Sequence, residues 1–286
     1  MLFRTIKGLK SLNSCIYKVL QFYKSIGISK QAVHKHLNND LERTEERSYL
    51  LQIIYQIRED HPTMCVRDMY FKINPSTLGR DAFEHMCKVE GLSVMRHLNY
   101  RRTIDSSGVI RFDNLLINLI INKIDQVWQS DITYFDLQGK FYYITFIIDA
   151  YSRRIVGHST SNRLTTEQTT FVAIQLAFKT RGKKKLEGLI LHSDGGGQYY
   201  DKEFISLIRK QGLISSMCEY PWDNGKAERI NGVIKNNYLI HRSIKTFDEL
   251  KQEVDRSVKL YNYEKPHIGL KRKTPITFEN EILSLH

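Results

Sequence analysis

Three strand-like segments joined by short turns lie between Val127 and Ser159, and they constrain the fold more than any other feature. Val127–Leu137 alternates along a strand, Phe141–Asp149 is rich in aromatic and β-branched residues, and Arg153–Ser159 follows after another short turn. Parallel neighbours would need a crossover of a dozen or more residues, so strands this close in sequence pair antiparallel. The sequence therefore predicts an antiparallel meander.

The segments after this meander alternate between helix and strand. Helices are predicted over Thr165–Thr180, Lys202–Gln211 and Lys226–His241, with strands over Leu189–His192 and Ile214–Met217. Three antiparallel strands followed by such βαβα units give a mixed sheet covered by helices. We predict an α/β fold with a mixed five-stranded sheet and flanking helices, preceded by an all-helical region.

The predicted all-helical region includes a possible helix-turn-helix. Gly27 suits the turn, and Ser29 can cap the helix that follows it. In that helix Lys30, Gln31, His34 and Lys35 would face outward, toward a DNA major groove. An ordinary surface helix explains the same stretch.

The pattern divides the chain into five predicted segments. They are a helix-turn-helix segment at 1–43, a second helical DNA-binding region at 44–104, a linker at 105–125, the α/β core at 126–242 and a C-terminal helical and basic tail at 243–286. The linker contains the polar break Asp105–Gly108.

The chain is basic, with 43 Lys and Arg against 31 Asp and Glu and a formal net charge of +12. Such a surface attracts polyanions, of which nucleic acid is the commonest. A basic protein without a nucleic-acid role is the alternative. The four cysteines are scattered, which argues against a disulfide framework and favours a reduced cytosol. No apolar run approaches the length of a membrane helix, and no signal peptide is recognisable.

Three acidic residues occupy positions where a function would place them. Asp131 lies inside the first strand, Asp194 follows the fourth strand and precedes three glycines, and Glu228 lies in the first turn of a helix. If the first and fourth strands are neighbours, Asp131 and Asp194 face one cleft and the helix lays Glu228 across it. Crowded carboxylates repel one another unless cations neutralise them. Oxygen ligands of this kind suit Mg²⁺ or Mn²⁺, and two such ions can clamp a phosphodiester.

Each acidic residue taken alone has an ordinary structural explanation, as a capped turn, a helix-start carboxylate or a strand-edge aspartate. Asp136, Asp149 and Asp201 are less suited to catalysis. We expect Asp149 to shape the turn with Ser152 and Arg153, and Asp201 to cap a helix. His192 is expected to be a structural neighbour of Asp194.

Several blocks of the chain resemble bacterial insertion-sequence transposases with a retroviral-type integrase core, specifically the second-frame proteins of the insertion-sequence-three family. These blocks are Val127–Tyr134, Phe146–Gly157, His192–Tyr199, Asp223–Gly232, Tyr261-Asn262, Pro266-His267 and Thr274-Pro275. The interval between Asp194 and Glu228 is shorter than in many members, and the loop Cys218–Gly225 is the place where this shortening would fall.

The resemblance implies a ribonuclease H-like core with Asp131, Asp194 and Glu228 as a DDE triad that binds two Mg²⁺ ions. It also implies that the protein recognises terminal inverted repeats in double-stranded DNA. Strand transfer into target DNA would then proceed without a covalent protein–DNA intermediate. We expect a homo-oligomer on DNA in the bacterial cytoplasm, associated with the nucleoid and not with a membrane.

Further contacts to DNA are expected around the triad. Lys226 and Arg229 flank Glu228, while Asn231 and Lys235 share its helix face and could contact phosphates near the scissile bond. A solvated helix face is the alternative. The short basic runs Lys183–Lys185 and Lys271–Lys273 are weaker candidates. Trp222 and the tyrosines could stack on unpaired bases, although we expect core packing for most of them.

Two other functions fit parts of the pattern. A nuclease of the same fold would hydrolyse nucleic acid without joining it. A non-catalytic DNA-binding regulator would use the helix-turn-helix alone, but it would leave the three carboxylates unexplained.

Overall fold

The computed structural model describes residues 27–94, 112–182 and 186–284, and the chain divides into two compact units between Ile57 and Arg58. Three predictions therefore fall outside the described residues in whole or in part: the first helix of the helix-turn-helix, the break Asp105–Gly108 and the basic run Lys183–Lys185.

Helix α3 spans Lys30–Asp60 and begins as the sequence predicted, with the Ala32 amide donating to Ser29 Oγ over 3.1 Å. Lys30, Gln31, His34 and Lys35 are exposed on it. The helix continues without a break through residues 43 and 44, where the sequence predicted a boundary. No Gly or Pro interrupts this stretch, so nothing in the backbone chemistry ends the helix there.

Helices α4 (Val66–Ile73) and α5 (Arg80–Val89) belong to the same compact unit as the α/β core. Two ion pairs connect α4 to the C-terminal part of the chain. Arg272 Nη1 lies 2.6 Å from Asp68 Oδ1, and Lys72 Nζ lies 2.9 Å from Glu264 Oε2. The predicted division between residues 44–104 and the core therefore does not coincide with the boundary between the compact units, because the second unit already begins at Arg58.

The sheet contains β1 (Val127–Leu137), β2 (Lys140–Asp149), β3 (Ile155–Ser161), β4 (Ile190–Ser193) and β5 (Ile214–Met217), in the order β3-β2-β1-β4-β5. β1 pairs antiparallel with β2 and parallel with β4, so it is the central strand. The mixed five-stranded sheet with flanking helices confirms the predicted fold class and the ribonuclease H-like arrangement that the resemblance implied.

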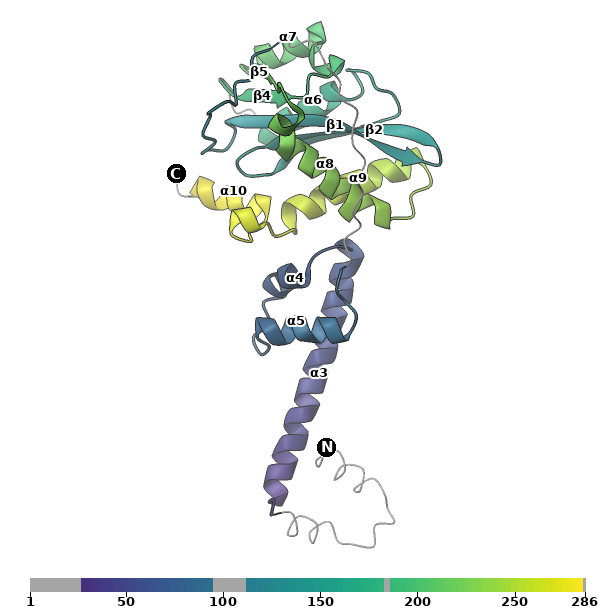
Figure 1. Ribbon diagram of the computed structural model, residues 1–286, viewed down its shortest axis with the longest axis vertical. Helices are drawn as coiled ribbons and strands as arrows, with labels where there is room; N and C mark the ends of the chain where they lie inside the picture. Colours follow the sequence, from purple (N-terminus) through teal and green to yellow (C-terminus); the bar gives the residue numbers. More distant parts are fainter. Residues whose placement is uncertain (1–26, 95–111, 183–185, 285–286) are drawn as a thin grey trace. The chain divides into compact units, whose positions relative to one another are not determined.

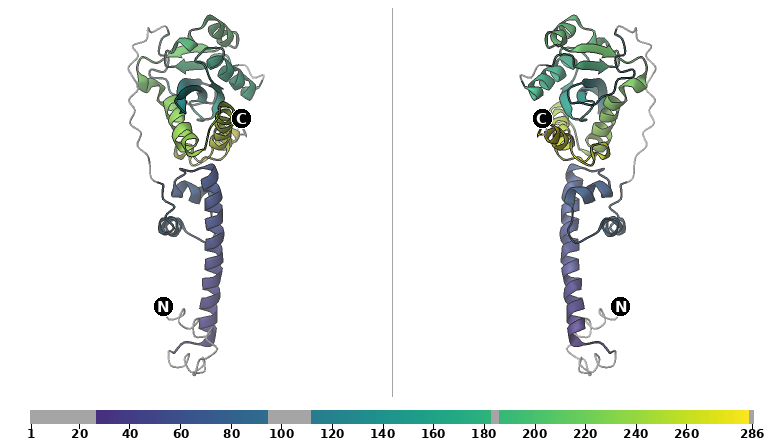
Figure 2. Two further views of the ribbon diagram at one scale, coloured as in Figure 1. Left: turned by 90° about the vertical axis from the view of Figure 1, so that its right-hand side faces the viewer. Right: turned by 90° about the vertical axis from the view of Figure 1, so that its left-hand side faces the viewer.

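Helices cover both faces of this sheet. α6 (Thr170–Arg181) and α7 (Lys202–Lys210) pack on one face around Trp128, Ile147 and Val156. α8 (Gly225–Asn237) and α9 (Phe247–Tyr263) pack on the other. Figure 2 gives two further views of the layers, with α8, α9 and α10 in green to yellow.

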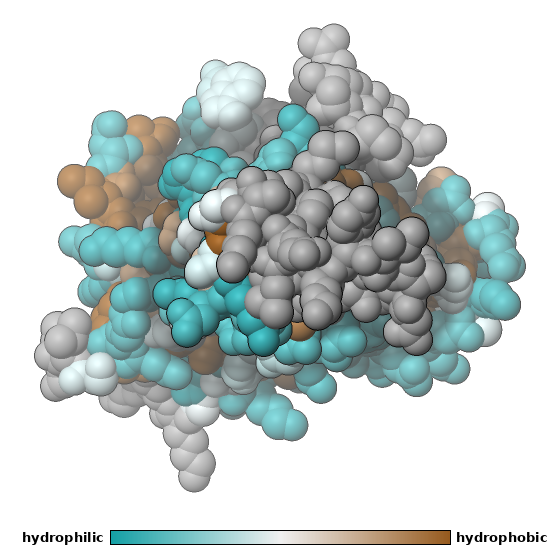
Figure 3. All heavy atoms as spheres, turned by 90° about the horizontal axis from the view of Figure 1, so that it is seen from below, coloured by the Kyte–Doolittle hydropathy of each residue, from teal (hydrophilic) through white to brown (hydrophobic). Residues whose placement is uncertain are grey.

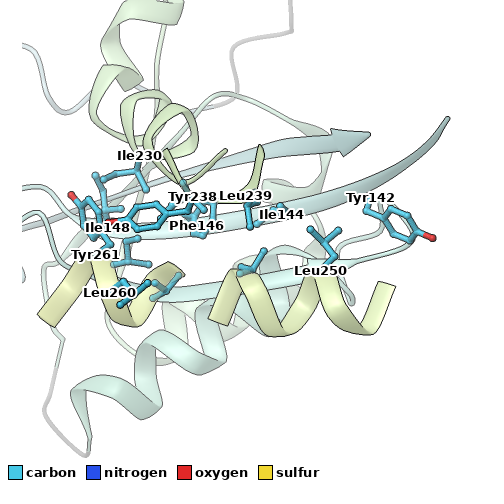
Figure 4. Close-up of a cluster of buried hydrophobic side chains, with 14 of the residues drawn as sticks. Tyr142, Ile144, Phe146, Ile148, Ile230, Tyr238, Leu239, Leu250, Leu260 and Tyr261 are labelled. Atoms are coloured by element: carbon cyan, nitrogen blue, oxygen red, sulfur yellow. The ribbon is translucent and has the colours of Figure 1, made fainter. Parts of the chain in front are cut away.

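The larger hydrophobic cluster joins the sheet to the C-terminal helices. Ile144, Phe146 and Ile148 point from β2 toward Leu250 and Tyr261 on α9 (Figure 4). All five side chains are buried. Residues after 242, predicted as a tail, are therefore part of the core, because the apolar face of α9 covers β2. The last helix, α10 (Pro275–Ser284), packs on α9.

Gly157 in β3 explains how closely α6 approaches the sheet. A Cβ atom at this position would collide with the carbonyl oxygen of Ala173 and would lie 2.9 Å from Cβ of Ala177. Only a glycine permits this distance between strand and helix, so the small residues on both elements fix the height of α6 above the sheet.

A buried cluster of charges, which we call the ion cluster, holds α10 against the core. Arg181 at the end of α6 donates to Asp125 Oδ1 over 2.7 Å and to both carboxylate oxygens of Glu279 over 2.8 Å. Glu279 also accepts from Ser152 Oγ and from Arg154 Nη1. Burial alone would raise the pKa of Glu279, but the contacts with Arg181 lower it below its usual value.

The described surface is mostly hydrophilic on the face drawn in Figure 3, where hydrophobic side chains form limited areas. Among the described helices, none combines the length and the apolar character that crossing a bilayer requires. Asp149 shapes its turn as predicted, accepting from the amides of Tyr151 and Ser152, and Asp201 caps α7.

The ion cluster predicts a large loss of stability for Arg181→Met. This change removes both hydrogen bonds from Arg181 to Glu279, whose side chain is 1% exposed, and leaves that buried carboxylate with Arg154 as its remaining cationic partner. Breaking such a pair costs about 3–5 kcal/mol. Chemical denaturation measures the loss, with the exposed Lys179→Met on the same helix as control. The double variant Arg181→Met, Glu279→Met should recover part of it, and a loss in Arg181→Met no larger than in the control would contradict the role of the cluster.

Candidate active site

The parallel pairing of β1 with β4 brings Asp131 and Asp194 together. Ser130 lies opposite Ser193 in the register, and each carboxylate is the next residue along its strand. Adjacent parallel strands keep such neighbours side by side, at the carboxyl end of β4 where ligands bind in sheets of this kind. The structure therefore produces the neighbouring strands on which the prediction depended.

The glycines after Asp194 form the turn that presents its carboxylate. Gly195 has φ of +71°, a conformation that residues with a side chain rarely adopt. A Cβ atom there would also collide with the Met217 side chain. The amide of Gly196 then donates to Asp194 Oδ1 over 3.2 Å. This turn orients the carboxylate through the backbone.

The side chains of Asp223 and Asn224 fix the loop before α8, and Asn224 connects it to β1. The sequence predicted no separate role for either residue. Asp223 Oδ2 accepts from the amides of Glu219 and Tyr220, at 3.2 and 3.1 Å, and from Asn114 Nδ2 at 3.0 Å. Asn224 Nδ2 donates to the Ser130 carbonyl over 2.9 Å. These contacts set where α8 begins, and so where Glu228 lies relative to Asp131.

Asn231 contacts the carboxylate of Asp131 directly. Its Nδ2 donates to Asp131 Oδ2 over 2.7 Å, and the side chain is buried. The helix spacing predicted that Asn231 contacts DNA phosphates, but in the structure its side-chain amide faces Asp131. Since Asn231 follows Glu228 by three residues, both lie on the helix face that points to β1.

The three carboxylates interact electrostatically. Burial raises the pKa of Asp131 to about 8, with further increases from the charges of Asp194 and Glu228. Burial also raises the pKa of Asp194, against the hydrogen bonds from Gly196 and Asp131. The pKa of Glu228 is raised by burial and by Asp194. Burial and the charges of neighbouring acids therefore act together to raise the pKa values of Asp131 and Glu228.

The residues around the triad suit a hard divalent cation. Among the described residues, no three His, Cys, Asp or Glu side chains form a geometry that would hold a metal ion. The donors nevertheless fit in kind, because carboxylate oxygens are what Mg²⁺ and Mn²⁺ prefer. The buried amide oxygens of Gln129, Asn224 and Asn231 also have no hydrogen-bond partner in the described structure. A cation would relieve the repulsion that adds to the effect of burial on the pKa values of Asp131 and Glu228.

The other predicted contacts around Glu228 separate into two groups. Lys235 Nζ donates to Thr133 Oγ1 over 3.4 Å and lies 4.8 Å from the centre of the Tyr134 ring, so it shares the triad's side of α8. Lys226 instead donates to the Ala150 carbonyl over 2.8 Å. The charge of Arg229 acts on Lys265 and His267.

Tyr220 and Trp222 form an exposed aromatic pair on the loop before α8. Their ring centres lie 4.6 Å apart with an angle of 5° between the planes. Trp222 is 72% exposed, so it is not one of the aromatic residues that pack in the core. The turn built by Asp223 holds both rings outward. His192 behaves as predicted: it is buried, and its Nδ1 lies 2.9 Å from Ser216 Oγ.

Comparison with known proteins identifies similar cores. The family model described as integrase core domain matches residues 122–220, and a second model of that description matches residues 216–275. The transposase for insertion sequence element IS629 of Shigella sonnei is 28% identical over 240 residues, which are 81% of this chain and 79% of that protein.

Two further similarities cover the core. The transposase for insertion sequence element IS904 of Lactococcus lactis is 32% identical over 169 residues, which are 57% of this chain and 66% of that protein. The solved HTLV-2 integrase catalytic core domain in complex with magnesium covers 54% of this chain and 95% of that chain, at 21% identity and a TM-score of 0.44.

The raised pKa of Asp131 predicts how the stability of the metal-free protein depends on pH. A carboxyl whose pKa is raised by folding keeps its proton in the folded state at pH values where the unfolded state has already lost it. The free energy of unfolding therefore falls as the pH rises from about 4 to about 8. Asp131→Asn removes this loss. The variant should therefore be more stable than the parent at pH 8 and equal to it below pH 4, as measured by denaturation in EDTA. An equal pH dependence of the two proteins would show that Asp131 is not crowded.

Proposed function

Because this chain belongs to the insertion-sequence transposases with an integrase core domain, we propose that Asp131, Asp194 and Glu228 are the carboxylates that cut and join DNA at the ends of such an element. The observation that carries this assignment is the parallel pairing of β1 with β4, which makes Asp131 and Asp194 neighbours, together with the contact of Asn231 on the helix of Glu228 with Asp131. The substrate would be double-stranded DNA with terminal inverted repeats, together with target DNA.

The three carboxylates would hold two divalent metal ions, Mg²⁺ or Mn²⁺. When bound, such ions supply the charge that activates an attacking oxygen and stabilises a leaving one at a phosphodiester. In this arrangement Asp131 and Asp194 are contributed by neighbouring strands, and Glu228 by the first turn of α8. No side chain of the protein needs to act as a nucleophile, because water and then the freed 3′-hydroxyl serve in that role.

The protein's own groups would orient these carboxylates. Asn231 donates a hydrogen bond to a carboxylate oxygen of Asp131, and the amide of Gly196 donates one to a carboxylate oxygen of Asp194. Such donors also select the ionised form of the acid. Asn224 fixes the first turn of α8 through Ser130, and so holds Glu228 at the edge of the site.

The surroundings of the site suit DNA. The exposed Tyr220–Trp222 pair lies on the loop that leads to Glu228, and stacked aromatic rings bind unpaired bases irrespective of sequence. The net charge of +12 favours a polyanion. The exposed side chains Lys30, Gln31, His34 and Lys35 on α3 remain our prediction for a separate groove contact.

The triad is tested by Asp131→Asn, Asp194→Asn and Glu228→Gln. Each variant should lose strand transfer by at least about 10²–10³-fold, which is the rate cost of removing one pre-organised electrostatic group from an active site. Band-shift binding to the element ends should persist. Asp136→Asn, on the same strand, is the control and should stay active. Full activity in any triad variant would refute the assignment, and hydrolysis without joining by the parent protein would favour the nuclease.

Asn231 is expected to act as a positioning residue for Asp131. Loss of an outer hydrogen-bond partner of a metal ligand typically costs 10–100-fold in metal affinity or activity. Asn231→Ala should therefore raise the Mg²⁺ concentration needed for half-maximal strand transfer by about 10–100-fold. Asn236→Ala, at an exposed position of the same helix, should leave the Mg²⁺ dependence unchanged. A uniform loss of activity at every Mg²⁺ concentration would indicate a structural role only.

A further inference from the structure

A second group of charged residues lies outside the triad and includes the C-terminal blocks singled out in the sequence. We call it the basic cluster: Arg153, Lys226, Arg229, Lys265 and His267. Its members come from the β2–β3 turn, from α8 and from the loop after α9, so the fold gathers them from three distant parts of the chain.

Contacts made at the β2–β3 turn and in the loop after α9 place members of the basic cluster near one another. The guanidinium of Arg153 fills the space that a Cβ atom on Gly269 would occupy, which shows that it lies against the loop after α9. In that loop the His267 amide donates to the Lys273 carbonyl, and the His267 carbonyl accepts from the amides of Leu270 and Arg272. The ring of His267 meets Tyr261 edge-on, with 4.7 Å between ring centres.

The cations of the basic cluster lack the carboxylate partners that other half-buried cations of this protein have. Arg154, Arg181 and Arg272 all form salt bridges of 2.6–2.8 Å. Within the described residues, Arg153, Lys226, Arg229 and Lys265 form no ion pair. The acids whose charges act on Lys265 and Lys226, which are Asp68 and Asp149, are engaged elsewhere. Asp68 pairs with Arg272, and Asp149 accepts from backbone amides and from Arg181.

Burial and the neighbouring positive charges together lower the pKa values of the half-buried members His267 and Lys265. Burial lowers the pKa of His267 to about 3, with further lowering from Lys265, Arg153 and Arg229. Burial also lowers the pKa of Lys265, and Arg229 adds to this effect against Asp68 and Cys65. In addition, the buried Nε2 atom of His267 has no hydrogen-bond partner among the described residues. Like charges and an unsatisfied buried nitrogen are costly unless an anion is present.

We propose that the basic cluster binds a phosphate group of the DNA backbone at a site distinct from the carboxylate triad. The guanidinium groups of Arg153 and Arg229 match the geometry of phosphate oxygens, and the ammonium groups of Lys226 and Lys265 add point charges. Because Lys226 and Arg229 flank Glu228 on α8, a duplex held at this site is also fixed relative to the triad. The choice of DNA as the source of the phosphate rests on the proposed function.

The double variant Lys226→Gln, Arg229→Gln tests this site, since both side chains are exposed and their loss should not disturb the core. Affinity for a linear duplex carrying the element end is measured in EDTA at several salt concentrations. Each lost phosphate contact should reduce the slope of log K against log salt by about 0.9. The exposed Lys210→Gln on α7 is the charge-matched control for a single lysine, and the double variant Lys226→Arg, Arg229→Lys should keep the parent slope.

A slope in the Gln double variant equal to that of the parent would overturn the phosphate site. Because the binding assay contains no metal, its result is independent of catalysis. A reduced slope together with a parent protein that joins no DNA would sustain the phosphate site and remove the transposase mechanism. An unchanged slope in the Gln double variant, together with normal joining by the parent protein, would overturn the phosphate site and support the transposase mechanism.

Inorganic phosphate separates a DNA phosphate from a free anion. An anion that binds only the folded state raises the thermal midpoint. At constant ionic strength, phosphate should stabilise the parent more than the Gln double variant, and the nitrogen resonances of the His267 ring should shift on addition of either phosphate or the duplex. Stabilisation by phosphate combined with an unchanged DNA slope would identify a free-anion site and overturn the assignment to DNA.

Discussion

The repulsion among three acids is the constraint on which the rest of the structure depends. The parallel register of β1 and β4 makes Asp131 and Asp194 neighbours, although each buried carboxylate destabilises the other. A strand at the edge of a sheet could move and so separate two such carboxylates. Here β1 is the central strand and both faces of the sheet are covered by hydrophobic clusters, so the acids cannot move apart. Functional sites commonly hold such locally unfavourable groups within a fold that over-determines them.

Buried charges occur in two arrangements in this protein: paired with an opposite charge, or grouped with charges of the same sign. In the ion cluster, Arg181 and Glu279 satisfy one another and join α6, the β2–β3 turn and α10. In the triad and the basic cluster, like charges gather, and none of their members forms an ion pair with an opposite charge among the described residues. The first pattern needs no ligand and contributes to stability. The second leaves a field that only an outside ion or phosphate can neutralise, which is why we interpret the two sites as functional and the ion cluster as structural.

Helix α8 connects these two uncompensated sites. Its apolar residues Ile230 and Ile234 pack into the larger hydrophobic cluster and fix the rotation of the helix. Glu228 and Asn231 then face β1, while Lys226 reaches the end of β2. A single rigid element therefore sets the spacing between the proposed cation site and the proposed phosphate site. Such spacing is what a bound DNA strand requires, because its phosphates are held at regular intervals.

The sequence by itself determined the alternating strands, the order of helices and strands after Val127, and the identity of the three acids. These features depend on local periodicity and on residue chemistry, which are written in consecutive residues. Only the tertiary structure decided that α9 belongs to the core, that Asn231 bonds Asp131, that Lys226 reaches the Ala150 carbonyl and that the charge of Arg229 acts on the loop after α9. The spacing along a helix shows which residues share a face, but the packing of distant apolar side chains decides what that face meets.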